Sequence, residues 1–179
     1  MPLRPPQTLT DGTVVLRELR ADDCEAVLET MRDPLVARWL NMPARPSADD
    51  FAALLRLVLD GRASGARIDF AVTVNGDDAP VGAVIASRRH RDNYELAYLA
   101  GPHGRGRGVM TRAVRLLCEW LFGEGVGRIE VRTHPRNDAS RRLAERCGFQ
   151  PEGLERKSIW LHGRREDALV FSLLPEDPR

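Results

Sequence analysis

Hydrophobic and polar positions along the chain repeat with two different periods. Segments that alternate in polarity, are rich in β-branched residues and are bounded by turn residues are typical of strands. Seven such segments are predicted, at residues 13–19, 68–74, 81–87, 94–99, 128–133, 153–161 and 164–173. Segments in which apolar residues recur every three or four positions are typical of helices lying on a core. These are residues 22–32, 47–61, 109–122 and 137–146, with one further helical turn in residues 35–40.

Capping and turn residues mark the ends of these elements. Ser47 followed by Asp50 resembles a capping box, Asn137 suits an N-cap, and Gly148 suits the position just beyond a helix end. The three strands between residues 68 and 99 are joined by short turns, which predicts an antiparallel meander. The order β-α-α-β-β-β-α-β-α-β-β predicts one mixed α/β domain. This domain is expected to span residues 13–173, after an N-terminal extension (1–12) and before a C-terminal tail (174–179).

Composition narrows the class of protein. A chain of 179 residues can bury a sizeable core in one domain. Lys and Arg number 27 against 26 Asp and Glu, so the net charge of +1 gives no general attraction to nucleic acid or to an anionic membrane. Cys24, Cys118 and Cys147 form no CxxC pair, which favours reduced thiols and argues against a metal site. Cys118 and Cys147 are expected to be core residues. No run of apolar residues is long enough to span a bilayer, and a cytoplasmic protein is expected.

The candidate chemistry lies where residues 101–108 (GPHGRGRG) lead into the helix that begins at Val109. Glycine lets a backbone turn sharply and approach a ligand closely. The first amides of a helix lack intrahelical partners and attract phosphate. Arg105 and Arg107 add positive charge and hydrogen-bond donors. Neither a Walker motif nor the dinucleotide fingerprint is present, so the loop indicates a phosphate-binding site of another kind or, alternatively, an ordinary glycine-rich turn.

Two motifs in this order resemble the GNAT N-acetyltransferase superfamily. Residues 105–110 (RGRGVM) resemble the family loop Arg/Gln-x-x-Gly-x-Gly/Ala, with Met110 where the family usually has a small residue. Residues 137–149 resemble the second motif, in which Asn137-x-x-Ser140 is followed by an apolar, Glu and Gly-Phe pattern. With residues 94–98 (YELAY) and 16–23 (LRELRADD), the match is similar to ribosomal-protein N-terminal (alanine and serine) acetyltransferases, over residues 13–173.

The resemblance implies acetyl-CoA as the cofactor that donates the acetyl group. It also implies a GNAT-like fold, a mostly antiparallel sheet with helices on both faces, in which the fourth and fifth strands splay apart. The pantetheine arm of CoA would lie along the end of the fourth strand. Together with the loop, the resemblance predicts these cofactor-binding residues: Tyr98, Leu99, Ala100, Arg105, Gly106, Arg107, Gly108, Val109, Met110, Thr111, Asn137 and Ser140.

Two catalytic residues are implied by the same resemblance. Glu95 stands where family members place a base, and Ser140 matches a position close to the sulfur, from which it could donate a proton to the thiolate. Each has a structural alternative: Glu95 as a salt-bridged strand residue, and Ser140 with Asn137 as residues that stabilise a helix start. His134 is a second candidate base. The backbone amide of Leu99 or Ala100 is the candidate donor to the oxyanion.

The sequence thus predicts an N-acetyltransferase whose acceptor is a primary amine, on a protein N-terminus or a small molecule. The alternative is a CoA-binding sensor or scaffold without transferase activity, and the near-neutral charge counts against nucleic-acid binding. The acceptor side is expected between residues 35–61 and the final hairpin, a region that holds Trp39, Met42 and Trp160. The acyl-chain preference stays open, and a homodimer is expected from the family likeness alone.

Overall fold

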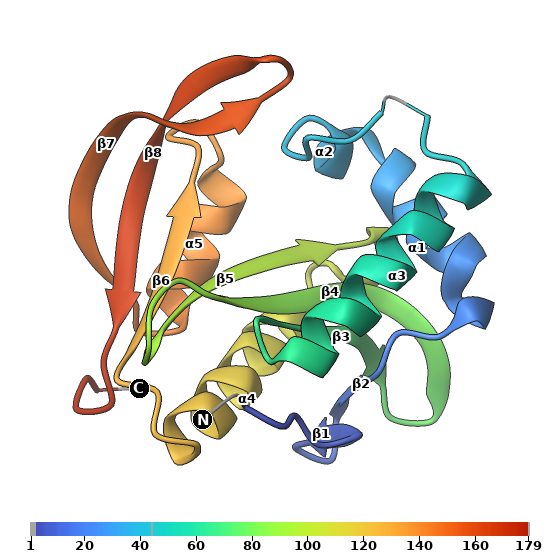
Figure 1. Cartoon of the computed structure of the whole chain (residues 1–179), viewed down its shortest axis with the longest axis horizontal. Helices are drawn as coiled ribbons and strands as arrows, with labels where there is room; N and C mark the ends of the chain where they lie inside the picture. Colours follow the sequence, from blue (N-terminus) through green and yellow to red (C-terminus); the bar gives the residue numbers. More distant parts are fainter. Residues whose placement is uncertain (1–2, 44, 179) are drawn as a thin grey trace.

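The structure is a computed structural model and describes residues 3–43 and 45–178. Within these residues eight strands form one sheet in the order β1-β2-β3-β4-β5-β6-β8-β7 (Figure 1). They are β1 (Thr8–Thr10), β2 (Val14–Arg17), β3 (Arg67–Val74), β4 (Asp77–Arg88), β5 (Asn93–Ala100), β6 (Arg128–Thr133), β7 (Gln150–Leu161) and β8 (Arg164–Leu173). Neighbouring strands run antiparallel except β5 and β6, which are parallel. The predicted mixed, mostly antiparallel fold is confirmed.

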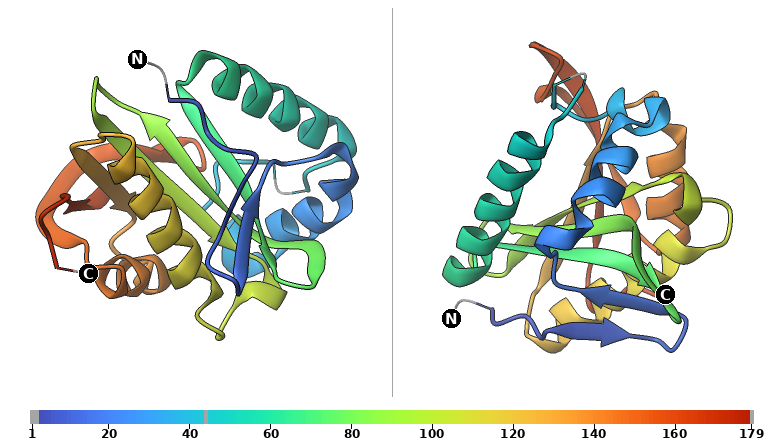
Figure 2. Two further views of the ribbon diagram at one scale, coloured as in Figure 1. Left: turned by 90° about the horizontal axis from the view of Figure 1, so that it is seen from below. Right: turned by 90° about the vertical axis from the view of Figure 1, so that its right-hand side faces the viewer.

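Helices cover both faces of this sheet, as predicted (Figure 2). They are α1 (Cys24–Arg32), α2 (Pro34–Ala37), α3 (Ala48–Ser64), α4 (Val109–Gly123) and α5 (Asp138–Arg146), with short 3₁₀ turns η1 (Ala21–Asp23) and η2 (Pro102–Gly104). α1 and α3 pack on one face, and α4 lies on the other beside α5. Between α4 and the sheet, Leu16, Phe70, Leu117 and Leu121 have no exposed surface. Burying such side chains is the main favourable contribution to folding.

The cysteines that were predicted to be core residues are buried. Cys118 and Cys147 are each 1% exposed and belong to the same hydrophobic cluster as α4. Burial raises the pKa of the Cys147 thiol to about 11, so this side chain stays protonated at neutral pH. Both residues therefore contribute apolar volume to the core.

Two of the predicted helix starts carry the caps that the sequence indicates. Ser47 Oγ accepts from the Asp50 amide at 3.3 Å, and Asp50 Oδ2 accepts from the Ser47 amide at 2.8 Å, which completes the capping box of α3. At the start of α5, Asn137 Oδ1 accepts from the Ser140 amide at 3.2 Å. The break predicted after α1 also occurs, because Pro34 opens α2 and Asp33 caps it.

The structure corrects several predicted boundaries. α3 does not end near Gly61 but continues to Ser64, and Gly65 closes it in the left-handed conformation. Gly61 is instead a packing residue, since a Cβ there would lie 2.8 Å from the Arg67 Cβ. β4 begins earlier than predicted, at Asp77, and β7 at Gln150. The two strand extensions lie at the N-terminal ends of β4 and β7, where pairing with a neighbouring strand prolongs each beyond its apolar segment.

The predicted N-terminal extension contributes a strand that the sequence pattern did not reveal. β1 pairs with β2 at the edge of the sheet, with Thr8 opposite Arg17. A three-residue strand is too short for a periodic signal, so only its pairing defines it. The domain boundaries themselves stay a prediction. Residues 1–2 of the extension and residue 179 of the tail lie outside the described residues.

The separation of β5 from β6 positions the candidate site. The two strands pair over four positions only, from Asn93 opposite Arg128 to Leu96 opposite Val131. Beyond Leu96, β5 stays paired with β4 as far as Ala100, whereas β6 stays paired with β8 as far as Thr133. The predicted fourth and fifth strands are β5 and β6 of the structure, and their predicted splay is therefore confirmed. It leaves backbone groups on the β6 side of β5 without a strand partner.

In the described part of the chain, no helix combines the length and apolar character needed to cross a membrane. The same residues contain no group of three or more His, Cys, Asp and Glu side chains arranged to hold a metal ion.

Candidate active site

A groove of about 640 Å³ opens where β5 and β6 part. Its walls are the ends of these strands, the loop before α4, the start of α5, the α2 segment and the end of β7. The cofactor-binding residues predicted from the sequence line this groove, apart from Arg107. The structure therefore brings together the two motifs, which lie about 30 residues apart in the chain, around one space.

The loop before α4 keeps an open path to the helix start. Gly106 and Gly108 have φ angles of +75° and +72°, which favour glycine, and a Cβ at either position would meet nothing within 4 Å. Gly108 is the N-cap of α4 and carries no side chain that could cap the helix. The first helical hydrogen bond runs from the Arg112 amide to the Gly108 carbonyl at 3.1 Å. The amides of residues 109–111 thus precede the helical ladder, as phosphate binding requires.

The arginines of this loop already have protein partners. Arg105 lines the groove and forms a two-pronged ion pair with Asp33, with Nη2–Oδ1 at 2.6 Å and Nη1–Oδ2 at 3.3 Å. The hydrogen bond from Arg105 lowers the pKa of Asp33, so this carboxylate stays charged at neutral pH. Arg107 donates to the His103 carbonyl on the exposed side of the loop. The structure therefore separates two arginines that the sequence treats alike.

Tyr98 and Ser140 are joined across the groove by two hydrogen bonds. Ser140 Oγ donates to the Tyr98 hydroxyl at 3.1 Å, and that hydroxyl donates to the Ser140 carbonyl at 3.0 Å. Burial raises the pKa of Tyr98, so its phenol stays protonated. The pair ties the end of β5 to the first turn of α5. Asn137 is the N-cap of α5, which is the structural role that the sequence offered as an alternative to cofactor binding. Its role in cofactor binding stays a prediction.

Glu95 lies outside the residues that line the groove, although its neighbours Leu96 and Ala97 line it. Its carboxylate is 3.2 Å from Arg132 Nη1 and 3.4 Å from Arg89 Nε. This is the ion-paired arrangement that the sequence left open as the alternative. A role as base stays a prediction. It requires a path along which a proton can pass from the groove to this carboxylate.

His134 lies at the end of β6 and lines the groove beside Trp39. The two ring centroids are 5.1 Å apart. The Nδ1 atom of His134 accepts a hydrogen bond from the Arg136 amide at 3.0 Å, so the neutral ring carries its proton on Nε2. In this tautomer the ring offers a donor at Nε2.

The far end of the groove is formed by segments that the sequence could not join. Trp39 follows α2, and Trp160 lies near the end of β7. The turn after β7 reaches the α2 segment, because His162 Nε2 lies 3.1 Å from the Arg38 carbonyl (Figure 1). Leu35 and Trp160 remain 55% and 54% exposed at this end. Met42, predicted for the same region, lines an adjoining cavity instead.

Sequence reasoning missed Asp33, which pairs with the groove residue Arg105, and two arginines that line the groove, Arg142 and Arg146. The last two lie four residues apart, so they occupy one face of α5, and both line the groove. This spacing was an available signal. Asp33 had only the signal of an N-cap before Pro34, which says nothing about Arg105, its partner 72 residues away.

Comparisons with known proteins agree with this site. The model of the family described as "Acetyltransferase (GNAT) domain" matches residues 13–150. The N-acetyltransferase p20 of Bacillus licheniformis is 26% identical over 96% of this chain and 98% of its own length. A candidate ribosomal-protein-serine acetyltransferase from Vibrio cholerae superposes with a TM-score of 0.86 at 22% identity, covering 97% and 100% of the two chains.

A structure of Mycobacterium smegmatis RimJ in complex with CoA-disulfide is similar as well. Its TM-score is 0.84 at 20% identity, over 96% of this chain and 88% of the other. Three observations indicate the same family: β5 and β6 part, the start of α4 is uncapped, and the family model matches most of the chain. The protein is an N-acetyltransferase and belongs to the GNAT acetyltransferase family.

Proposed function

We propose that the protein transfers an acetyl group from acetyl-CoA to the primary amine at the N-terminus of a polypeptide. The observation that carries this proposal is that the parted ends of β5 and β6 and the uncapped start of α4 border one groove. An extended, amide-rich arm with phosphates at one end matches that combination. The similarity to a structure that contains CoA supports the same donor.

The donor end of the groove would be held by main-chain groups. The amides of residues 109–111 would face the diphosphate, where the positive end of the helix dipole favours anions. Arg105, Arg142 and Arg146 line the same groove and would add charge-assisted hydrogen bonds to phosphate oxygens. The free side of β5 at residues 97–100 would pair with the amides of the pantetheine arm, as an added strand pairs with a sheet edge.

The transfer requires a neutral amine and a leaving thiolate. The amine nitrogen forms a C–N bond with the thioester carbonyl carbon, the C–S bond breaks, and the electron pair passes to sulfur. An α-amine has a pKa of about 8, so a modest base acting through water suffices to remove its proton. Glu95 is proposed for that base, and Ser140, whose hydroxyl can rotate away from Tyr98, for the proton donor to sulfur.

The acceptor would enter at the end of the groove between α2 and the β7–β8 turn. This end is open and carries the exposed side chains of Leu35 and Trp160, which a polypeptide can cover. The candidate ribosomal-protein-serine acetyltransferase among the similar structures favours a polypeptide acceptor over a small amine. The homodimer expected from the family likeness stays a prediction.

The test is a panel of peptides with different first residues and of small amines, each incubated with acetyl-CoA. Release of free thiol and the mass of the product report transfer, and a peptide whose N-terminus is already blocked is the matched control. The proposal predicts release with free N-termini only. Acetylation of small amines alone would contradict the acceptor, and CoA binding without any transfer would indicate the sensor alternative.

A further inference from the structure

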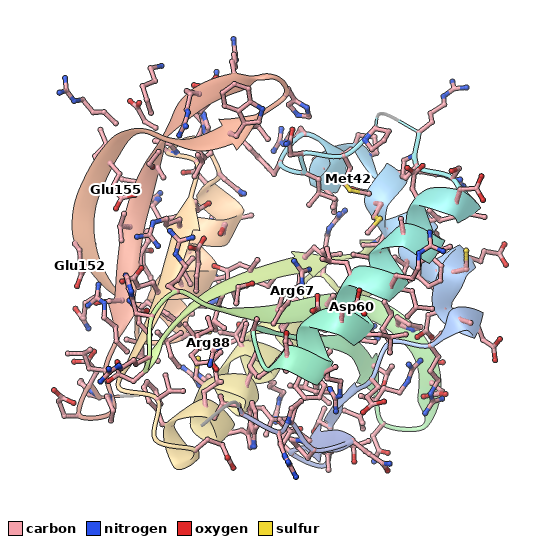
Figure 3. The ribbon with its side chains drawn as sticks, viewed as in Figure 1. Met42, Asp60, Arg67, Arg88, Glu152 and Glu155 are labelled. Atoms are coloured by element: carbon pink, nitrogen blue, oxygen red, sulfur yellow. The ribbon has the colours of Figure 1, made fainter. Side chains whose placement is uncertain are left out.

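A second cavity, of about 170 Å³, lies between the sheet and the helices α1 and α3. Met42 marks its α2 end, and Arg67 lies beside α3 over the sheet, both labelled in Figure 3. Leu40 and Leu99 line this cavity and also line the groove. Leu99 belongs to the end of β5, along which the proposed function places the pantetheine arm that carries the thioester. The cavity therefore adjoins the groove at the end of β5, and we call it the side pocket.

The walls of the side pocket are almost entirely apolar. Arg67 and Asp69 reach it, but they bind each other, with Nε–Oδ2 at 2.8 Å and Nη2–Oδ1 at 2.7 Å. A polypeptide main chain placed here would lose hydrogen bonds to water without finding partners, which costs several kcal/mol in a purely apolar medium. A hydrocarbon chain carries no such penalty. The chemistry of the walls therefore selects an alkyl group.

The floor of the side pocket, which is the side formed by the sheet, consists of small residues that leave space above the strands. Ala71 on β3 lies directly opposite Ala83 on β4, and Gly82 lies next to it. A Cβ on Gly82 would instead point to the α4 face, within 3.0 Å of the Met110 sulfur, and would come within 2.5 Å of the Leu99 carbonyl oxygen. Glycine at this position lets β4 approach the end of β5 closely. Because protein interiors are close-packed, an apolar space left at this point is unusual.

The volume indicates the size of the occupant. An apolar cavity of about 150 Å³, engineered in another protein, binds benzene, so a cavity of about 170 Å³ suits a chain of about six carbons. The methyl group of acetyl would leave most of it empty. The proposed function gives the acceptor a different entry, between α2 and the β7–β8 turn. The unassigned space next to Leu99 therefore belongs to the donor side of the reaction.

We propose that this side pocket binds the hydrocarbon chain of an acyl-CoA donor, so that saturated acyl groups of about four to six carbons are better donors than acetyl. The inference rests on the proposed function and refines its donor. The bonds formed and broken are those of acetyl transfer, since only the chain attached to the carbonyl changes. Each added methylene that the pocket accommodates favours the longer donor through burial of apolar surface.

The first experiment compares donors on the unaltered protein. Dissociation constants of acetyl-, butyryl-, hexanoyl- and decanoyl-CoA are measured by calorimetry without acceptor, and kcat/KM with one fixed peptide amine. We expect hexanoyl-CoA to bind at least about tenfold more tightly than acetyl-CoA, and decanoyl-CoA to lose that gain. Equal affinities across the series, or a steady fall beyond acetyl, would overturn the proposal.

The second experiment changes the pocket in opposite directions. Ala83→Leu fills the floor and should abolish the gain of hexanoyl-CoA while acetyl-CoA binding persists. Leu54→Ala removes volume from the α3 wall and should move the optimum towards longer chains. If one variant fails to fold, the other still decides, because either predicted shift must appear. Unchanged donor profiles in folded variants would refute the inference.

A third measurement separates the acyl chain from an acceptor side chain as occupant. With acetyl-CoA as the only donor, peptides with small and large apolar first residues are compared in the native protein and in Ala83→Leu. Selective loss of the large residue would assign the pocket to the acceptor and overturn the proposal. Failure of every CoA thioester to bind would refute the proposed function itself, whereas acetyl transfer with a flat donor profile refutes only this inference.

Discussion

The Tyr98–Ser140 pair joins β5 to α5 inside the groove through two hydrogen bonds, and the two hydroxyls have different roles in it. The Tyr98 hydroxyl is the link between the elements, since it both donates and accepts. The Ser140 hydroxyl only donates to Tyr98, so it can turn to another acceptor without breaking the Tyr98–carbonyl bond. The two side chains can therefore be tested separately.

We predict that Ser140→Ala lowers kcat about tenfold to 100-fold and leaves the affinity for CoA nearly unchanged, because it removes only the proton donor. Tyr98→Phe should instead lower the free energy of unfolding by about 1–3 kcal/mol, since it leaves buried polar groups without their partner. Steady-state kinetics, CoA binding and chemical unfolding measure these effects. Equal losses of kcat and CoA affinity in Ser140→Ala would assign Ser140 to the helix start alone.

A catalytic role of Glu95 can be separated from its ion pair with Arg132, because Glu155 forms an ion pair with the same arginine, at 3.1 Å. We predict that Glu95→Gln lowers kcat/KM by about 100-fold, as removal of a general base does. Glu155→Gln, which removes an ion pair with the same arginine, should lower it less than about threefold. The measurement is the pH–rate profile of both variants. A similar loss in both would show that the two carboxylates act only on Arg132.

Among the elements, the start of α4 owes its open amides to Gly108. We predict that Gly108→Leu weakens CoA binding at least about tenfold, because the side chain would project into open space that the ligand needs. The strain of a non-glycine residue at φ +72° costs about 1–2 kcal/mol as well.

A matched control for this strain exists just beyond the other end of α4. Gly125 has a φ of +84° and also has nothing within 4 Å of its Cβ position. Gly125→Leu should lower stability by a similar amount and leave CoA affinity intact. The comparison uses thermal unfolding and CoA titration. Unaltered CoA affinity in a folded Gly108→Leu protein would refute the phosphate site.

The α2 segment is connected to the phosphate-binding loop by the Asp33–Arg105 pair. Asp33 also accepts from the Leu35 amide at 2.9 Å and so caps α2. Asparagine caps a helix as well as aspartate does but carries no charge. We predict that Asp33→Asn frees Arg105 for phosphate and tightens CoA binding about twofold to fivefold, an effect that high salt should diminish.

Asp33→Ala is the companion variant for this pair. It removes the cap together with the charge, so it should disturb α2 and raise the KM for the acceptor, whereas Asp33→Asn should leave that KM unchanged. Weaker CoA binding in Asp33→Asn would show the opposite coupling, in which the ion pair shapes the loop for its ligand.

For the whole molecule, the sheet depends on a short junction between β5 and β6, and Glu130 lies at that junction. Its carboxylate accepts from Asn93 at 3.0 Å, from Arg128 at 2.8 Å and from Arg132 at 2.6 Å. Burial alone would raise the pKa of Glu130, but these hydrogen bonds outweigh it and lower the pKa to about 2. The junction is thus held by a charge that folding stabilises.

This pKa predicts how the stability of the protein depends on pH. A folded pKa of about 2 against an ordinary value of 4.5 means that Glu130 contributes fully above about pH 4.5 and loses its contribution as pH falls towards 2. The contribution at neutral pH is about 3 kcal/mol. Urea unfolding at pH 7, 4 and 3 should therefore show a stability gap between the native protein and Glu130→Gln that narrows in acid. A gap independent of pH would contradict this assignment.

Local sequence determined a large part of this protein. The apolar periods located the helices and most strands, and the caps at Ser47 and Asn137 set the starts of α3 and α5, because these signals act within a few residues. The glycines at 106 and 108 indicated a phosphate loop for the same reason, since their conformations depend on the local backbone. With the second motif, this was enough to indicate the family.

Tertiary structure alone decided what these residues touch. Arg105 meets Asp33 across 72 residues and Glu95 meets Arg132 across 37, so no local pattern reveals either pair. The same holds for Gly61, whose place inside α3 follows from the close approach of Arg67, and for the side pocket, which exists only where α1 and α3 cross the sheet. Short-range propensities and motifs are written in neighbouring residues, whereas ion pairs, packing and cavities arise from distant segments that folding brings together.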